Sequence, residues 1–163
     1  MCDYSLMTIP NRLAISGEEL VVQRFEAGSV VGLASASDLR KRQEVRRVQP
    51  QGLWPRVKSF FNPPDGPAIP AVCIPPGARL LVQDIPPTLQ HECGFQEEAE
   101  EAVFTQITAA VNTFRDAVRF QNGVQLLLQR LAEGQRVRVL DLSSAEDEVA
   151  VSTGQRREFT RAA

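Results

Sequence analysis

The sequence predicts a mainly β protein, a small antiparallel barrel or sandwich of about eight short strands with one or two short helices. Asn122-Gly123 lies between two apolar runs, which is the strongest short signal for a β-hairpin with a type I′ turn, in which both residues have positive φ. In the expected strand from Arg136 to Leu142, Val137 and Val139 alternate with two arginines at the two-residue period of a half-buried strand. Other strand-length apolar runs are separated by Gly and Pro. The alternative is an α+β fold in which Val124 to Leu131 is a helix, because Leu, Gln and Arg favour helices.

Length and composition predict one domain spanning residues 1–163. The chain has 163 residues, of which 43% are hydrophobic, enough for one compact core. A basic, Pro- and aromatic-rich excursion at about 35–70 and a loose tail from about residue 143 are expected to lie outside that core. We find neither a leading signal segment nor a run of roughly 18 apolar residues. The prediction is therefore a soluble, cytoplasmic protein without a membrane span.

The first quarter of the chain predicts several short strands. Met1 to Pro10 is expected to form an edge strand that ends at the proline. Arg12 to Ile15 and Glu19 to Phe25 flank a turn at Ser16-Gly17, and Val30 to Ala34 forms the next strand.

The excursion that follows differs from the rest of the chain. Ser37-Asp38 can cap a helix that runs through Val48 and stops at Pro50. Aromatic and basic residues then occur together from Leu53 to Phe61, and a Pro-rich cluster at 62–67 breaks any regular element.

Charge is segregated between the excursion and the remainder. Residues 38–60 hold seven basic and two acidic residues, a net charge of +5, which leaves −7 for the rest. We expect the basic run to lie near the acidic residues between Glu92 and Glu101, in the same fold or in a neighbouring copy.

The excursion is the predicted docking site for a protein partner or a second copy of the chain. A nucleic-acid partner is disfavoured because the chain is acidic overall, with a pI of about 5.5. The alternative is a solvated arm without a partner. The predicted partner-binding residues are Arg40, Lys41, Arg42, Arg46, Arg47, Trp54, Arg56, Lys58, Phe60 and Phe61.

The second half predicts further strands at 71–74, 79–85 and 103–108, with an acidic link from Thr88 to Glu101. A three-strand meander is expected from Asp116 to Leu142. Residues 77–85 and 134–142 share the pattern G-x-R-φ-x-V-x-D-φ. Two equivalent strands entered from glycine turns would produce such a match, and so would chance.

Three cysteines, an odd number, favour free thiols in a reducing compartment over a disulfide framework. Cys2, Cys73, His91 and Cys93 together match a Cys₃His ligand set for Zn, and thiolates also suit Cu(I). The spacing lacks a C-x-x-C knuckle, so the competing interpretation is a buried Cys73 with His91 and Cys93 as ordinary loop residues.

Cys2 is also a candidate nucleophile. Removal of Met1 would place a thiol and an α-amine on one residue, the arrangement that N-terminal-nucleophile hydrolases use. We find no oxyanion or substrate-binding constellation, phosphate loop, dinucleotide fingerprint or serine triad beside it. A non-catalytic accessory protein is thus the leading hypothesis, a thiolate metal-binding protein the second and a hydrolase the third.

Three sets of residues form motifs spread along much of the chain: Met1 to Leu6, Val72-Cys73 with Pro76-Gly77, and the stretch from Asp116 to Gln135. Together these motifs resemble a family of small bacterial proteins without an established activity. The resemblance implies a bacterial source and a shared fold. Relatives carry histidines where this chain has residues 112–115, Asn-Thr-Phe-Arg, so no metal role at that position transfers.

Overall fold

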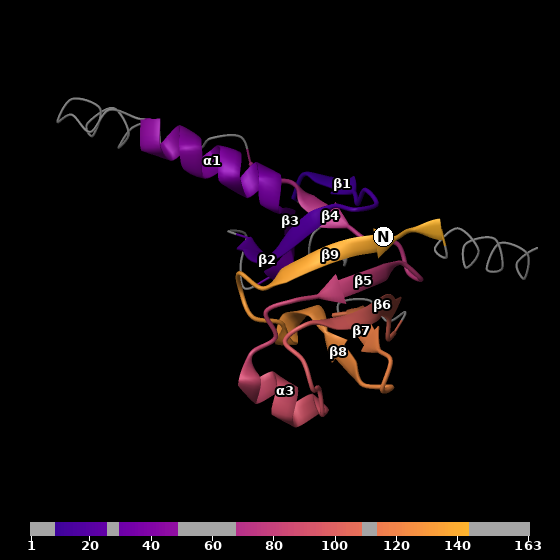
Figure 1. The fold of residues 1–163 in the computed structure, drawn as a ribbon. Coiled ribbons are helices and arrows are strands. Elements are labelled where there is room, and N and C mark those ends of the chain that lie inside the picture. The colour runs from indigo at the N-terminus through magenta and orange to yellow at the C-terminus, as the bar shows by residue number, and fades with distance from the viewer. Residues whose placement is uncertain (1–8, 26–29, 49–67, 109–113, 144–163) are drawn as a thin grey trace, which may run out of the picture.

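The computed structural model describes residues 9–25, 30–48, 68–108 and 114–143 (Figure 1). Within them, the fold is mainly β, with nine strands in one mixed sheet. The strands are β1 (Asn11–Leu13), β2 (Glu19–Phe25), β3 (Val30–Ser35), β4 (Ala71–Cys73), β5 (Arg79–Val82), β6 (Glu100–Gln106), β7 (Asp116–Phe120), β8 (Gln125–Leu127) and β9 (Arg136–Asp141). The helices are α1 (Ala36–Val48) and α3 (Pro87–Cys93), with one 3₁₀ turn, η2 (Leu128–Arg130).

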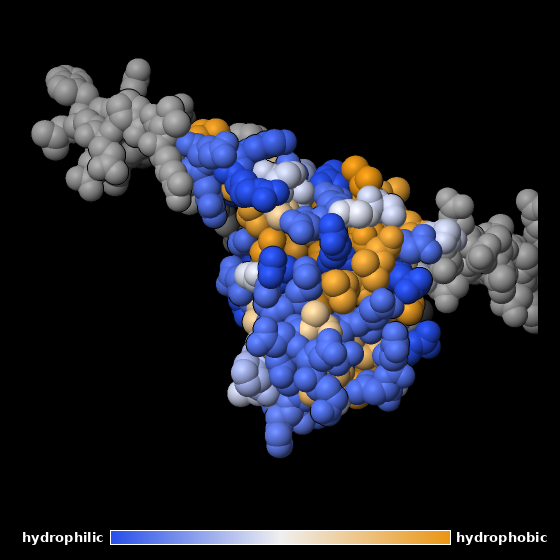
Figure 2. All heavy atoms as spheres, in the orientation of Figure 1, coloured by the Kyte–Doolittle hydropathy of each residue, from blue (hydrophilic) through white to orange (hydrophobic). Residues whose placement is uncertain are grey.

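The strand order is β1-β4-β3-β2-β9-β5-β6-β7-β8, and β1 pairs with β4 in parallel while the other neighbours are antiparallel. The mainly β prediction is confirmed. The sheet is not closed into a barrel. Exposed apolar side chains of Leu13 and Ile15 lie at the β1 end, where Figure 2 shows apolar atoms on the surface.

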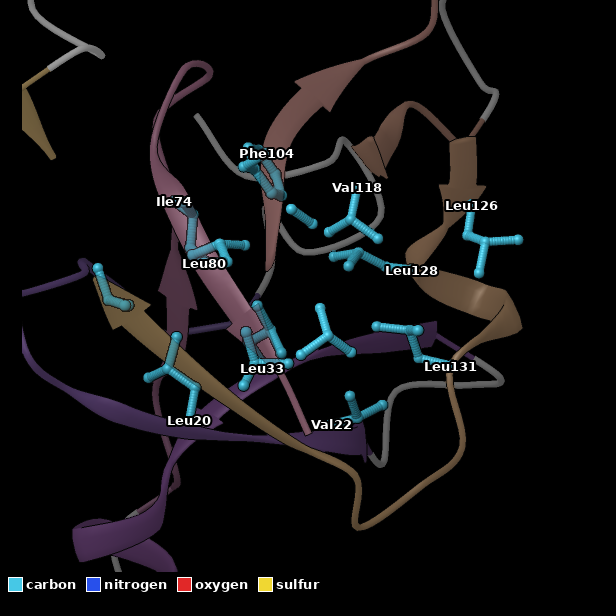
Figure 3. Close-up of a cluster of buried hydrophobic side chains, with 14 of the residues drawn as sticks. Leu20, Val22, Leu33, Ile74, Leu80, Phe104, Val118, Leu126, Leu128 and Leu131 are labelled. Atoms are coloured by element: carbon cyan, nitrogen blue, oxygen red, sulfur yellow. The ribbon is translucent and has the colours of Figure 1, made fainter. Parts of the chain in front are cut away.

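The core lies inside a curled sheet, because side chains from almost every strand point toward one another (Figure 3). Leu20 and Leu80 are fully buried, Phe104 is almost so, and Leu131 closes the cluster from the segment after η2. A second, smaller cluster of Phe25, Ala34 and Ala71 lies apart from this core and receives Leu39 of α1.

The hairpin predicted at Asn122-Gly123 is confirmed in position, since β7 and β8 pair on either side of it. The expected type I′ turn is wrong. Gly123 has φ 88°, but Asn122 does not have positive φ, so the loop has three residues with glycine in the left-handed position. The Asn122 side chain explains the difference, because its Oδ1 accepts from the Val124 N–H (3.0 Å) and its Nδ2 donates to the Cys93 carbonyl (2.9 Å).

The predicted three-strand meander is also wrong. β9 does not pair with β8 but lies between β2 and β5. Between β8 and β9 the chain forms η2 and a turn in which Gln135 N–H donates to the Ala132 carbonyl (3.0 Å), and this detour redirects the strand. The interpretation of residues 124–131 as a strand is confirmed for β8. The alternative of a helix is not observed, and the only helical residues in this segment are those of the 3₁₀ turn η2.

The two halves of the sheet repeat one arrangement about the central β5–β9 pair. β9 pairs with β2 and β2 with β3, whereas β5 pairs with β6 and β6 with β7. The residue register repeats together with the strand order, at constant offsets along the chain. The matching pairs are Leu20–Val137 with Ala102–Leu80, Val21–Arg136 with Val103–Arg79, and Glu19–Arg138 with Glu101–Leu81.

The turns that enter β5 and β9 repeat the same backbone geometry. Gly77 (φ 90°) donates its N–H to the Phe104 carbonyl over 2.9 Å, and Gly134 (φ 85°) donates to the Val22 carbonyl over 2.8 Å. Phe104 and Val22 each donate in return to the residue after the glycine, over 2.8 and 2.9 Å. The sequence match between 77–85 and 134–142 therefore marks two equivalent strands, one of the two interpretations that the pattern allowed.

Candidate functional site

The predicted docking residues are only partly described. Arg40, Lys41 and Arg42 lie on α1, and the helix range also includes Arg46 and Arg47. Trp54, Arg56, Lys58, Phe60 and Phe61 lie outside the described residues. The helix predicted from Ser37-Asp38 through Val48 is confirmed, with its first residue at Ala36.

An ion-pair cluster fixes the start of α1 to the sheet. Arg12 forms two hydrogen bonds with Glu18, one of them from Nη1 to Oε2 over 3.0 Å. Glu18 also accepts from the Ile15 N–H (3.1 Å), and the Arg12 guanidinium reaches Asp38 of α1 at 3.9 Å. Asp38 lies 3.8 Å from the Lys41 ammonium. We call Arg12, Glu18 and Asp38 the helix anchor.

The electrostatics of the helix anchor follow from partial burial. Burial alone would raise the pKa of Glu18, but hydrogen bonds from Arg12, the Ile15 N–H and Ser35 together lower it below its ordinary value. The hydrogen bond to Glu18 raises the pKa of Arg12. Both groups are therefore charged at neutral pH, and the pair serves to position α1. The sequence carried no signal for this pair, since Arg12 and Glu18 are ordinary residues of a strand and a turn.

Beyond its anchor, α1 extends away from the sheet (Figure 1). Leu39 packs on the small apolar cluster, while Arg40, Lys41 and Val45 are exposed. Hydrophilic side chains cover most of the visible surface of this helix (Figure 2). Since Val45 is 53% exposed, the described surface of α1 combines basic charge with an uncovered apolar side chain.

The acidic residues lie elsewhere. In Figure 1, α1 and α3 lie on opposite sides of the molecule, and the acidic residues from Glu92 to Glu101 belong to α3, β6 and their link. Glu92 pairs with Arg130 (2.6 Å) and Glu101 with Arg79 (2.9 Å). The expectation that the two charged runs meet within one chain is wrong for the described residues. Contact with a neighbouring copy stays a prediction.

The cysteines correct one expectation. Cys73 is disulfide-bonded, so the prediction of free thiols is wrong at this position. Pairing requires two Cα atoms within about 7 Å, a property of the tertiary fold that cysteine counting does not capture. Cys93, by contrast, is free.

The proposed metal ligands do not form a described site. Burial raises the pKa of the Cys93 thiol, and the neighbouring Glu92 charge adds to the effect. His91 and Cys93 are two residues apart on α3, a spacing that points side chains in different directions. Among residues that the structure describes, no group of three or more His, Cys, Asp or Glu could hold a metal ion. Cys2 lies outside those residues, both as a ligand and as a nucleophile.

In the described part of the chain, we find no helix with the length and apolar composition needed to cross a bilayer. Comparisons of the chain with family models, with curated proteins and with solved structures give no match.

Proposed function

We propose that this protein is a non-catalytic accessory protein that docks to an acidic surface of a partner protein through the excursion at residues 36–70. One observation carries the proposal. The repeated halves join equivalent strands by very different connections, residues 36–70 between β3 and β4 but only residues 121–124 between β7 and β8. The sheet can make this connection with a short loop, so the long, basic one is available for another role.

The chemistry of α1 favours a protein partner. Arg40 and Lys41 are exposed on a helix that contacts the rest of the fold through Asp38 and Leu39. The remainder of the molecule carries a net charge of −7, which opposes approach to a polyanion such as nucleic acid. An acidic protein surface can contact the helix locally, with Val45 as an apolar contact inside the charged rim. Trp54, Phe60 and Phe61 join the proposal from the sequence alone.

The chain supplies its own test loop. Replacing residues 36–70 by the Gln-Asn-Gly-Val sequence of residues 121–124 connects Ser35 to Ala71 as Phe120 is connected to Gln125. We expect this graft variant to keep the β circular-dichroism spectrum and cooperative unfolding, with a lower midpoint because Leu39 no longer packs on the small cluster. It should lose capture of the partner from lysate of the source cells.

Charge variants separate charge from shape. The variant with Arg40→Gln and Lys41→Gln should weaken capture, and added salt should weaken capture by the unmodified protein. The matched control carries Arg119→Gln and Arg138→Gln, which remove the same charge from two exposed strand positions. Equal capture by the graft variant and the unmodified protein would refute docking through the excursion.

A further inference from the structure

The outer edge of β8 is equivalent to the outer edge of β4, and β1 already pairs with that edge of β4. β8 ends the strand order on one side, and within the described residues no strand pairs with its outer edge. On the other side β4 would be the last strand, but β1 adds to it in parallel. An unpaired edge presents backbone donors and acceptors that can pair with an extended chain.

The register makes β4 and β8 equivalent. Val21 lies opposite Ala34, which lies opposite Ala71. In the other half Val103, the equivalent of Val21, lies opposite Arg119, which lies opposite Gln125. The first residue of β4 therefore corresponds to the first residue of β8, and both strands have three residues.

The backbone of β8 offers the same groups that β4 uses. On β4, Ala71 N–H donates to the Pro10 carbonyl (2.8 Å) and the Cys73 carbonyl accepts from Ala14 N–H (3.0 Å). In the β7–β8 ladder, Phe120 N–H donates to the Val124 carbonyl, and bonded pairs alternate with non-bonded pairs. The next bonded residue on β8 is Leu126, so Gln125 and Leu127 direct their N–H and C=O groups to the open edge.

The Glu100 carboxylate indicates which side chain a strand added to the β8 edge would carry. On the occupied side, the Arg12 side chain of β1 donates hydrogen bonds to the Glu18 carboxylate. Glu18 directly precedes β2, and its backbone carbonyl accepts from the Val139 N–H of β9. Glu100 has the equivalent place at the start of β6, opposite Val82 of β5. The structure gives Glu100 no ion pair among the described residues. A cationic side chain at the centre of an added strand would lie at the position from which Arg12 reaches its carboxylate.

We propose that the β8 edge binds an extended peptide segment of another protein, aligned parallel to β8, with Arg or Lys at its central position facing Glu100. The bound segment would take the place that Asn11–Leu13 takes on β4. Gln125 and Leu127 would supply the main-chain hydrogen bonds, and Glu100 would select the central cation. This site is independent of the excursion, because the graft variant leaves β8 and β6 unchanged.

The occupied edge supplies the probe. A fluorescein-labelled synthetic peptide with the sequence of residues 8–15, Thr-Ile-Pro-Asn-Arg-Leu-Ala-Ile, contains the β1 strand with its arginine. Titrated with the full-length protein in fluorescence anisotropy, it should bind saturably and with equal affinity to the graft variant. We expect Gln125→Pro, which removes one outward N–H, to weaken binding at least tenfold, whereas Gln125→Thr keeps that N–H and should bind like the unmodified protein.

Two further measurements keep the proposal falsifiable if Gln125→Pro does not fold. Glu100→Gln should weaken the arginine peptide several-fold, and a peptide with glutamine in place of arginine should not distinguish Glu100→Gln from the unmodified protein. Hydrogen exchange should show the Gln125 and Leu127 amides slowed by the peptide. Protection of Ala71 and Cys73 instead would mean that the peptide displaces β1, and this result, or no saturable binding, would overturn the proposal.

Discussion

At the scale of single residues, Glu18 shows how one carboxylate connects three elements. Its oxygens accept from Arg12 of β1 and from the Ile15 backbone, while Arg12 also reaches Asp38 on α1. Only 13% of the Glu18 side chain is exposed, so these partners replace most of its water. Loss of the charge would leave the half-buried Arg12 guanidinium with Asp38, at 3.9 Å, as its remaining carboxylate partner among the described residues.

We expect Glu18→Gln to destabilise the fold by about 1.5–3 kcal/mol at pH 7, a typical value for hydrogen bonds to charged groups. Because the pKa of Glu18 is lowered from its ordinary value of 4.5, its contribution is complete above that pH and disappears as pH falls through the lower folded pKa. Urea unfolding from pH 7 down to pH 3 measures this dependence. Glu97→Gln, at an exposed position, is the control. A difference between Glu18→Gln and the unmodified protein that stays constant with pH would contradict the assignment.

At the scale of elements, the entry turns of β5 and β9 depend on left-handed glycines. Gly134 has φ 85°, and a Cβ added there would meet no atom within 4 Å. The cost of a side chain is therefore conformational and not steric. Gly134→Ala should lower the free energy of unfolding by about 1–2 kcal/mol.

Gly134→Asn tests the same turn, because asparagine adopts the left-handed region more readily than alanine. We expect asparagine to cost less than alanine at this position, measured by urea unfolding midpoints. Equal stability of the alanine variant and the unmodified protein would show that the turn relaxes to another conformation.

Local patterns predicted where most elements lie, because alternation and turn residues act over a few positions. The α1 helix and the β7–β8 hairpin are examples. The predicted turn type was wrong at Asn122 because the side-chain amide of this residue donates a hydrogen bond to the Cys93 carbonyl, which belongs to a distant segment of the chain. The position of β9 between β2 and β5 was not predicted for the same reason, since the pairing partners of a strand depend on tertiary structure.

At the scale of the whole molecule, the repeated halves exchange their last strands. Along the chain, β5 comes at the end of the first half, after β2, β3 and β4, but it pairs with β6 of the second half. In the same way β9 comes at the end of the second half but pairs with β2 of the first. The pattern shared by residues 77–85 and 134–142 was the part of the sequence that indicated this repeat. Most other equivalent positions differ in residue type, as Ala34 and Arg119 do, because one lies near α1 and the other is exposed. The candidate site was predicted only as a charged segment, and neither its anchor nor the β8 edge carried a sequence signal.

Exchange of the last strands places the β5–β9 pair at the centre of the sheet, where the two halves meet. Val82 and Val139 are fully buried there, so we expect this pair to open less often than the outer strands. We expect native-state amide hydrogen exchange to be slowest in β5 and β9, about 100-fold or more slower than at edge strands β1 and β8 after correction for intrinsic rates. The exposed part of α1 after Leu39 should exchange fastest among the described helices and strands. If β1 or β8 amides matched those of β9, the sheet would unfold as one unit from any edge, and the central pair would not join the two halves.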